Sequence, residues 1–277
     1  TNGILNCLEA GIQDKRAHNA VVPYNVIWAS AIAAKMKVHT SLTDIPYAIT
    51  DHRVLGELGY TLYDDSGTIG KSLMNEGSIR FLVGKYTPDD FVRGYNETVQ
   101  NHIMPKLDMV PNIHILDCTD LEVNFHNENY EKSGISYSKR KKDDSILKSR
   151  GYKLSTLRGI VDDSGVIEDI RIGSLNMHDL TLSKEMIMTS PVLKSGDILI
   201  NDRGFLCRDI INYLKTERNV DIYVPLKKTM QSFNMAVSAA KMEDKWLANP
   251  KYSHQKITLV TDLGIYWNSE DTKNEVP

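Results

Sequence analysis

The sequence predicts an α/β fold in which a mixed sheet flanked by helices follows an all-helical N-terminal region. Three observations predict it. Residues 1–110 carry helical periodicity, residues 111–250 alternate β-prone and helical runs, and residues 251–277 return to β-prone runs. These ranges are the three expected parts of the chain: a helical region, a catalytic or binding core, and the start of a β-rich segment.

The clearest helix is predicted over residues 87–103. Thr87 is a candidate N-cap, Pro88 suits the first helical position, and the two acids that follow favour the positive end of the helix dipole. Apolar residues then recur every three or four positions from Val92 to Ile103, which forms one apolar stripe. Two more helices are predicted over residues 23–37 and 51–59.

The core begins with a strand candidate, "NIHILDCT", and then two alternating runs separated by "DDSG", which predict a hairpin. Helical and β-prone runs follow in turn. Helices are predicted at 177–188, 205–218 and 235–247, and strands at 196–201 and 220–226. This order predicts antiparallel strands first and βαβ units after them, in one sheet.

Composition places the chain among ordinary globular proteins. It has 277 residues, with 41% apolar and 25% charged side chains. No run of 18 apolar residues and no secretory leader is seen, so neither a membrane span nor a membrane partner is expected. The cysteines, Cys7, Cys118 and Cys207, lie far apart, which favours a reducing cytoplasm over a disulfide framework.

The net charge of −3 hides a strongly basic segment at residues 132–158. Only two acids lie in this segment, and its basic side chains are Lys132, Lys139, Arg140, Lys141, Lys142, Lys148, Arg150, Lys153 and Arg158. A local excess of one charge predicts a surface that binds a polyanion. The alternative is a solvated basic loop without a partner.

Two carboxylates stand at the ends of apolar runs: Asp117 closes "IHILD" and Asp202 closes "DILIND". If the two strands are neighbours, the carboxylates converge at the sheet edge where ligands bind in open α/β sheets. Adjacent carboxylates without a cation either raise a pKa or bind a divalent ion such as Mg²⁺. The alternative is that Asp202 pairs with Arg203 or caps the next turn, and that Asp117 is a turn residue.

Four other features receive structural interpretations. "GTIGKS" is not a phosphate loop, because Asp65 stands where the pattern requires glycine. His178 lies at a predicted helix start, where a cap or a surface position is favoured over a role near a metal. Cys118 points to the face opposite Asp117 and is expected in the core. Gly204 permits a sharp turn, and Phe205 packs onto the sheet.

Taken in order, several segments resemble the catalytic domain of bacterial insertion-sequence DDE transposases. They are "ILDCTDLEV", "GYKLSTLRGIVDDSGVIEDIRI", "NMHD", "ILINDRGF" and "VDIYVPLKK". "SLTDIPYAITDHRVLGELGY" resembles the helical region that precedes this domain. The resemblance covers the chain from about residue 20 and implies a ribonuclease-H-like fold.

The resemblance assigns Asp117, with Thr119, to the Asp-x-Thr motif and Asp202 to the Asp-Arg-Gly motif. It implies that these two aspartates bind two Mg²⁺ or Mn²⁺ ions. In that family, one ion activates water or a 3′-hydroxyl and the other stabilises the leaving 3′-oxygen. The resemblance therefore implies DNA cleavage and strand transfer.

The implied partners are double-stranded DNA, as transposon terminal repeats and as target, and a second copy of the chain on that DNA. The implied location is the bacterial cytoplasm, with the nucleoid. The DNA phosphates would be bound by Lys139, Arg140, Lys141, Lys142, Lys148, Arg150, Lys153 and Arg158. The N-terminal helices would help to bind the transposon ends.

The chain departs from the family at the third acid. The family places a glutamate on a late helix, in a Tyr-Arg-Glu-Lys signature that does not occur here, and Glu243 is a weak candidate without that signature. Residues 251–277 resemble the start of the β-rich insertion that precedes this glutamate, so the third ligand is expected beyond Pro277. The competing hypotheses are a DNA-binding remnant without catalysis and a ribonuclease-H-like nuclease without strand transfer.

Overall fold

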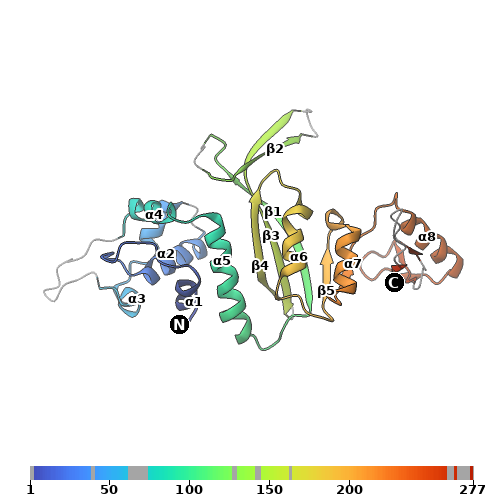
Figure 1. Cartoon of the computed structure of the whole chain (residues 1–277), viewed down its shortest axis with the longest axis horizontal. Coiled ribbons are helices and arrows are strands. Elements are labelled where there is room, and N and C mark those ends of the chain that lie inside the picture. Colours follow the sequence, from blue (N-terminus) through green and yellow to red (C-terminus); the bar gives the residue numbers. More distant parts are fainter. Residues whose placement is uncertain are drawn as a thin grey trace.

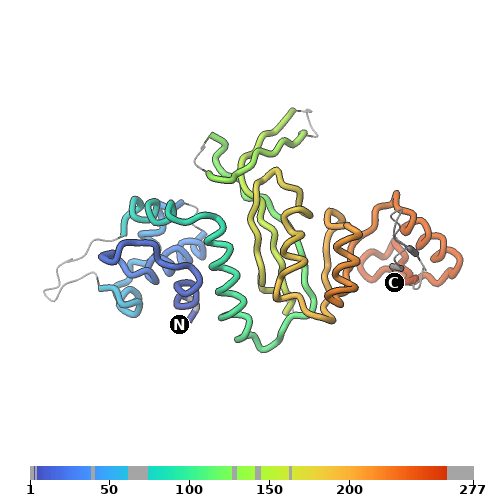
Figure 2. The backbone as a smooth tube through the Cα atoms, viewed as in Figure 1, coloured from blue at the N-terminus to red at the C-terminus, as the bar shows by residue number. Residues whose placement is uncertain are grey.

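The structure is a computed structural model that describes residues 3–38, 41–61, 74–126, 130–140, 145–161, 164–260, 265–266 and 275–276. Lys141, Lys142 and Asp65 lie outside these described residues. The chain is elongated: helices form one end, a sheet lies in the middle, and a small helix-containing region forms the other end (Figure 1). Figure 2 traces the same path through the Cα atoms.

The N-terminal region is helical, as predicted. Its elements are α1 (Gly3–Gly11), α2 (Tyr24–Met36), η1 (Leu42–Tyr47), α3 (His52–Glu57), α4 (Glu76–Val83), α5 (Pro88–Thr98), the π-turn η2 (Val99–Ile103) and η3 (Met104–Lys106). A small core of Val26, Leu55, Leu58 and Tyr60 holds α2 and α3 together. Thr87 forms a capping box with Asp90 at the start of α5, which confirms the predicted N-cap.

A mixed six-stranded sheet forms the centre of the molecule, as predicted. Its strands are β1 (Ile113–Val123), β2 (Gly134–Lys139), β3 (Ile146–Val161), β4 (Ser164–Ser174), β5 (Ile198–Asn201) and β6 (Asp221–Tyr223). β3 pairs antiparallel with β1, β2 and β4, whereas β5 pairs parallel with β1 and β6. The hairpin and the later parallel strands therefore lie in one sheet.

Helices α6 (Asp179–Thr189) and α7 (Arg208–Thr216) follow β4 and β5 and pack against one face of the sheet. The core between them and the sheet contains Leu116, Leu157, Met186, Ile187, Leu193, Leu199, Phe205, Ile210, Leu214 and Val220. The opposite face is more open, and its Ile200 and Tyr223 side chains are 38% and 62% exposed. The packing predicted for Phe205 is confirmed.

The C-terminal region contains α8 (Gln231–Glu243) and two small two-stranded sheets. These sheets pair β7 (Leu247–Ala248) with β8 (Lys256–Ile257) and β9 (Ile265–Tyr266) with β10 (Glu275–Val276). The predicted helix at 235–247 runs too far, because Asp244 adopts a left-handed φ of 48° and ends α8. In the part of the chain described, no helix has the length and apolar character to cross a membrane.

Candidate functional site

The two predicted aspartates lie on, or directly after, neighbouring strands of the sheet. β1 and β5 pair in parallel from Ile113–Ile198 to Leu116–Asn201, so one further step in the same register would bring Asp202, the residue after β5, beside Asp117. Neighbouring strands run about 4.8 Å apart, and residues in register on parallel strands point to the same face. The prediction that these strands are neighbours is confirmed, and both carboxylates emerge on the open face of the sheet.

Each carboxylate uses one oxygen to accept a backbone hydrogen bond. Oδ1 of Asp117 accepts from the backbone N–H of Cys118 at 2.8 Å. Oδ1 of Asp202 accepts from the backbone N–H of Gly204 and caps the 3₁₀ turn η4 (Arg203–Phe205). Asp202 therefore does cap the next turn, which was the alternative to a role in metal binding. These bonds orient both carboxylates and leave their Oδ2 atoms without a partner among the described residues.

The charge of the pair is not compensated by a neighbouring base. Neither aspartate forms an ion pair with any described residue, and Arg203 beside Asp202 is exposed. Two exposed, adjacent carboxylates with unshared oxygens are a suitable donor set for Mg²⁺ or Mn²⁺, which bind a few carboxylates together with water and phosphate oxygens. Within the described ranges, no group of three or more His, Cys, Asp or Glu side chains could hold a metal ion.

The structure gives Glu243 and His178, the two weaker candidates, other positions in the fold. Glu243 is the last residue of α8, which lies beyond α7 at the far end of the molecule from β1 (Figure 1). His178 is the N-cap of α6, and its Nδ1 accepts from the backbone N–H of Leu180 at 3.2 Å. His178 is thus the exposed cap residue that the sequence favoured.

The basic side chains of β3 divide between the two faces of the sheet. Thr156 lies directly opposite Asp117, so even-numbered positions of β3, including Lys148, Arg150 and Arg158, share the face of the aspartates. Lys153 points to the other face, where it pairs with Asp179 at the start of α6 and is largely buried. Lys139 ends β2 opposite Ile146, on the aspartate face, and Arg140 follows it on the surface.

A buried ionic cluster lies at the opposite end of the same strands. His114 is fully buried; its Nδ1 lies 2.7 Å from Oε2 of Glu168 and its Nε2 lies 3.0 Å from Oδ2 of Asp197. Burial opposes protonation of His114, but the hydrogen bonds and charges of the two acids outweigh it and raise its pKa. A register shift between Leu157 and Arg158 marks a bulge in the β3–β4 pairing, and Glu168 lies at this bulge.

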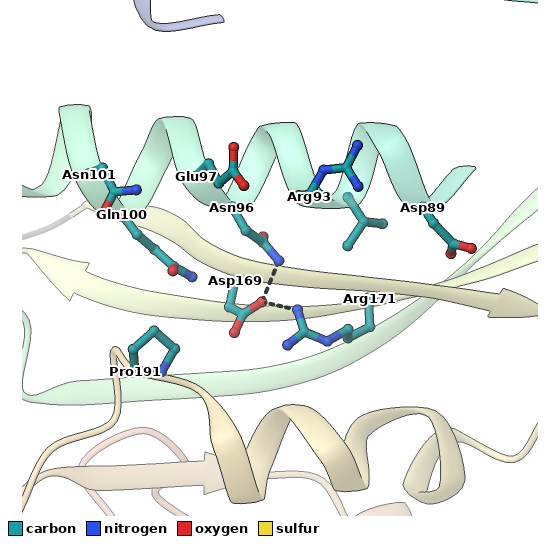
Figure 3. A pocket seen from close by; sticks show the side chains of 10 residues that line it. Asp89, Arg93, Asn96, Glu97, Gln100, Asn101, Asp169, Arg171 and Pro191 are labelled. Carbon is teal, nitrogen blue, oxygen red and sulfur yellow. Dashed lines mark hydrogen bonds and ion pairs between the residues drawn. The ribbon is translucent and has the colours of Figure 1, made fainter. Parts of the chain in front are cut away.

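A polar pocket of about 330 Å³ lies between α5 and β4 (Figure 3). Asp169 lies at its base, fully buried, and accepts hydrogen bonds from Asn96 at 2.8 Å, Arg171 at 2.6 Å and Ser190 at 2.6 Å. Burial raises the pKa of Asp169. Sequence reasoning missed both this pocket and the buried cluster, although two consecutive acids inside the apolar alternation of "VIEDIRI" were a signal for a bulge.

No family model matches the chain, and a search of curated proteins finds no similar sequence.

Proposed function

We propose that the chain is a metal-dependent DNA phosphodiester-transfer enzyme of the DDE transposase type. The observation that carries the proposal is the register of β1 and β5, which ends at Leu116 opposite Asn201 and, continued by one step, aligns Asp117 with Asp202. Nothing in the sequence requires these two residues to share a face, since 85 positions separate them in the chain. A metal site shared by the two carboxylates would explain why they are aligned.

The arrangement of the sheet supports a ribonuclease-H-like fold, which the sequence resemblance implies. An antiparallel group of strands contains β1, β3 and β4, and the chain then passes through α6 to the parallel strands β5 and β6. Asp202 directly follows the carboxyl end of β5, whereas Asp117 lies within β1, which continues to Val123. Ligand sites in open α/β sheets form where the parallel strands end.

In this proposal, Asp117 and Asp202 would hold the ions through their free Oδ2 atoms. When bound, the divalent ions would activate the attacking water or 3′-hydroxyl and stabilise the leaving 3′-oxygen. The chain itself orients the two carboxylates through the backbone N–H groups of Cys118 and Gly204. Arg158 lies on the same face and would bind a phosphate next to the one that reacts.

Metal binding and cleavage test the proposal together. Asp117→Asn and Asp202→Asn should each weaken Mn²⁺ binding, measured by calorimetry, and lower Mn²⁺-dependent nicking of DNA that flanks the gene by at least about 10²-fold. Asp120→Asn is the matched control, because Asp120 is exposed on the same strand but points to the other face. Full nicking by either Asn variant, or equal loss in the control, would refute the assignment.

A second candidate function is DNA binding without cleavage. It is favoured by one observation: no third acid, histidine or cysteine joins the pair in the described part of the chain. In that case, duplex DNA would still bind, and the binding would weaken with salt, but no Mg²⁺ or Mn²⁺ concentration would produce nicks.

A further inference from the structure

A two-stranded ribbon projects from the sheet beyond the end of β1. β3 pairs with β1 only from Arg150 onward, and its first residues, Ile146 to Ser149, pair with β2 alone. Figure 1 shows this ribbon standing clear of the helices on either side. Its two strands are held by their mutual backbone hydrogen bonds rather than by a core, so burial does not explain which side chains they carry.

The two faces of the ribbon differ sharply in chemistry. Tyr137 is opposite Lys148 in the register, and Ile135 is opposite Arg150, so these residues share one face. The other face carries Ser136, Ser138 and Ser149 with Leu147. A basic and aromatic face backed by a serine face suits a ribbon that contacts an anionic partner from one side.

Two of the cations on this face lie near aromatic rings. Nζ of Lys148 lies 5.7 Å from the ring centroid of Tyr137, which is itself 63% exposed. The Arg150 guanidinium lies 5.9 Å from the ring centroid of Phe125, and its Nε is buried without a hydrogen-bond acceptor. A cation that lies over the face of an aromatic ring can still donate hydrogen bonds to a phosphate from its other side. The buried Nε of Arg150 is not among these donors.

The face that carries Lys148 and Arg150 continues along β3 to the aspartate pair, although it carries no further cation on the way. Its positions run from Lys148 to Thr156, opposite Asp117, and none of them is acidic. These eight steps at about 3.3 Å each span about 26 Å. This length corresponds to about eight base pairs at 3.4 Å per step, which is less than one turn of duplex DNA.

We propose that the ribbon formed by β2 and the start of β3 is a DNA-flank clamp. It lays Lys148, Arg150 and Tyr137 against the backbone of duplex DNA within one helical turn of the phosphodiester at Asp117 and Asp202. The inference rests on the proposed function for the position of the reacting phosphate. Duplex DNA is the partner that fits best, because Lys148 and Arg150 lie two positions apart on one face and can contact successive backbone phosphates, whereas Lys153 on the other face is already paired.

The salt dependence of DNA binding tests the clamp directly. The probe is a 30-base-pair duplex of mixed sequence in EDTA, so that binding is measured without cleavage. Lys148→Ser and Arg150→Ser should each lower the slope of log Kd against log [KCl] by about one, and the double variant by about two. Ser138→Asp is the matched control: it changes the net charge by the same amount as Lys148→Ser but lies exposed on the opposite face of the ribbon.

A series of 8, 12, 16 and 24 base-pair duplexes tests the reach. The wild-type chain should gain affinity until the duplex spans both the aspartates and the ribbon, whereas the double variant should reach its full affinity at a shorter length. Unchanged slopes, an equal loss in Ser138→Asp, or identical length profiles would each overturn the clamp. Because no metal is present, these results stand apart from the cleavage test: nicking can fail while the clamp holds, and the reverse.

Discussion

Replacing His114 by leucine should remove a large part of the stability of the central sheet. The imidazole is fully buried between Glu168 and Asp197, whose side chains are 1% and 10% exposed. Leucine keeps most of the volume but leaves two buried carboxylates without their shared cation. Removing one partner from a buried ion pair costs about 3–5 kcal/mol, which is a substantial fraction of the 5–15 kcal/mol that stabilises a typical domain.

Urea unfolding followed by far-ultraviolet circular dichroism measures this loss. The midpoint should fall while the slope m stays constant, because the variant loses stability without changing the surface exposed on unfolding. His178→Leu is the control, since that histidine is an exposed helix cap whose loss should cost about 1 kcal/mol. A loss below about 1 kcal/mol in His114→Leu would show that the cluster is not a stabilising ionic contact.

The pH dependence of the same midpoint gives a second measure. Because the pKa of His114 is raised in the folded protein, its contribution is fully present below the unfolded pKa and is lost as pH rises through the folded value. Wild-type stability should therefore decline on the alkaline side of the histidine range. In His114→Leu this decline should be absent, because the group that releases the proton is gone.

Two further changes address packing and helix capping. Leu199→Ala should destabilise the protein by about 2–5 kcal/mol in the same urea titration, since Leu199 is fully buried in the core between the sheet and α7; a cost near zero would mean that this core collapses around the cavity. Thr87→Ala should cost about 1 kcal/mol, because it removes the capping box of α5, and Thr87→Ser should restore most of it.

The sequence predicted elements whose signals are local. The cap at Thr87, the strand end before Asp202, and the alternation of strands and helices each depend on a few adjacent residues, and the structure has them where expected. The strand end predicted at Asp117 is wrong, because β1 continues to Val123 in its pairing with β3. The ribbon was missed because the alternation in β2 covers only six residues, and the two strands are stabilised by pairing with each other rather than by burial. In the sequence, the charges of residues 132–158 formed one basic segment, and their division between the two faces of the sheet was not predicted.

The buried cluster was beyond sequence reasoning for a different reason. His114, Glu168 and Asp197 come from three distant segments, and they meet only because β1 pairs with both β3 and β5 and a bulge occurs in the β3–β4 pairing. For Lys153, the side of the sheet could not be predicted, because it depends on how β3 pairs with β1 and on which face α6 covers. Which side chains meet in such contacts is set by the register of the paired strands, and composition does not encode that register.

Asn96 of α5 forms the backbone hydrogen bonds with β4 that a neighbouring strand would otherwise form. Its side-chain amide accepts from the backbone N–H of Ile170 at 2.9 Å and donates to the carbonyl of the same residue at 3.1 Å, and Gln100 and Tyr95 bind the carbonyls of Glu168 and Ile167. An exposed strand edge invites another chain to add to it. Here a helix supplies the missing hydrogen bonds, so this stretch of the sheet is closed to edge-to-edge aggregation, and the N-terminal helices are fastened to the strands that they accompany.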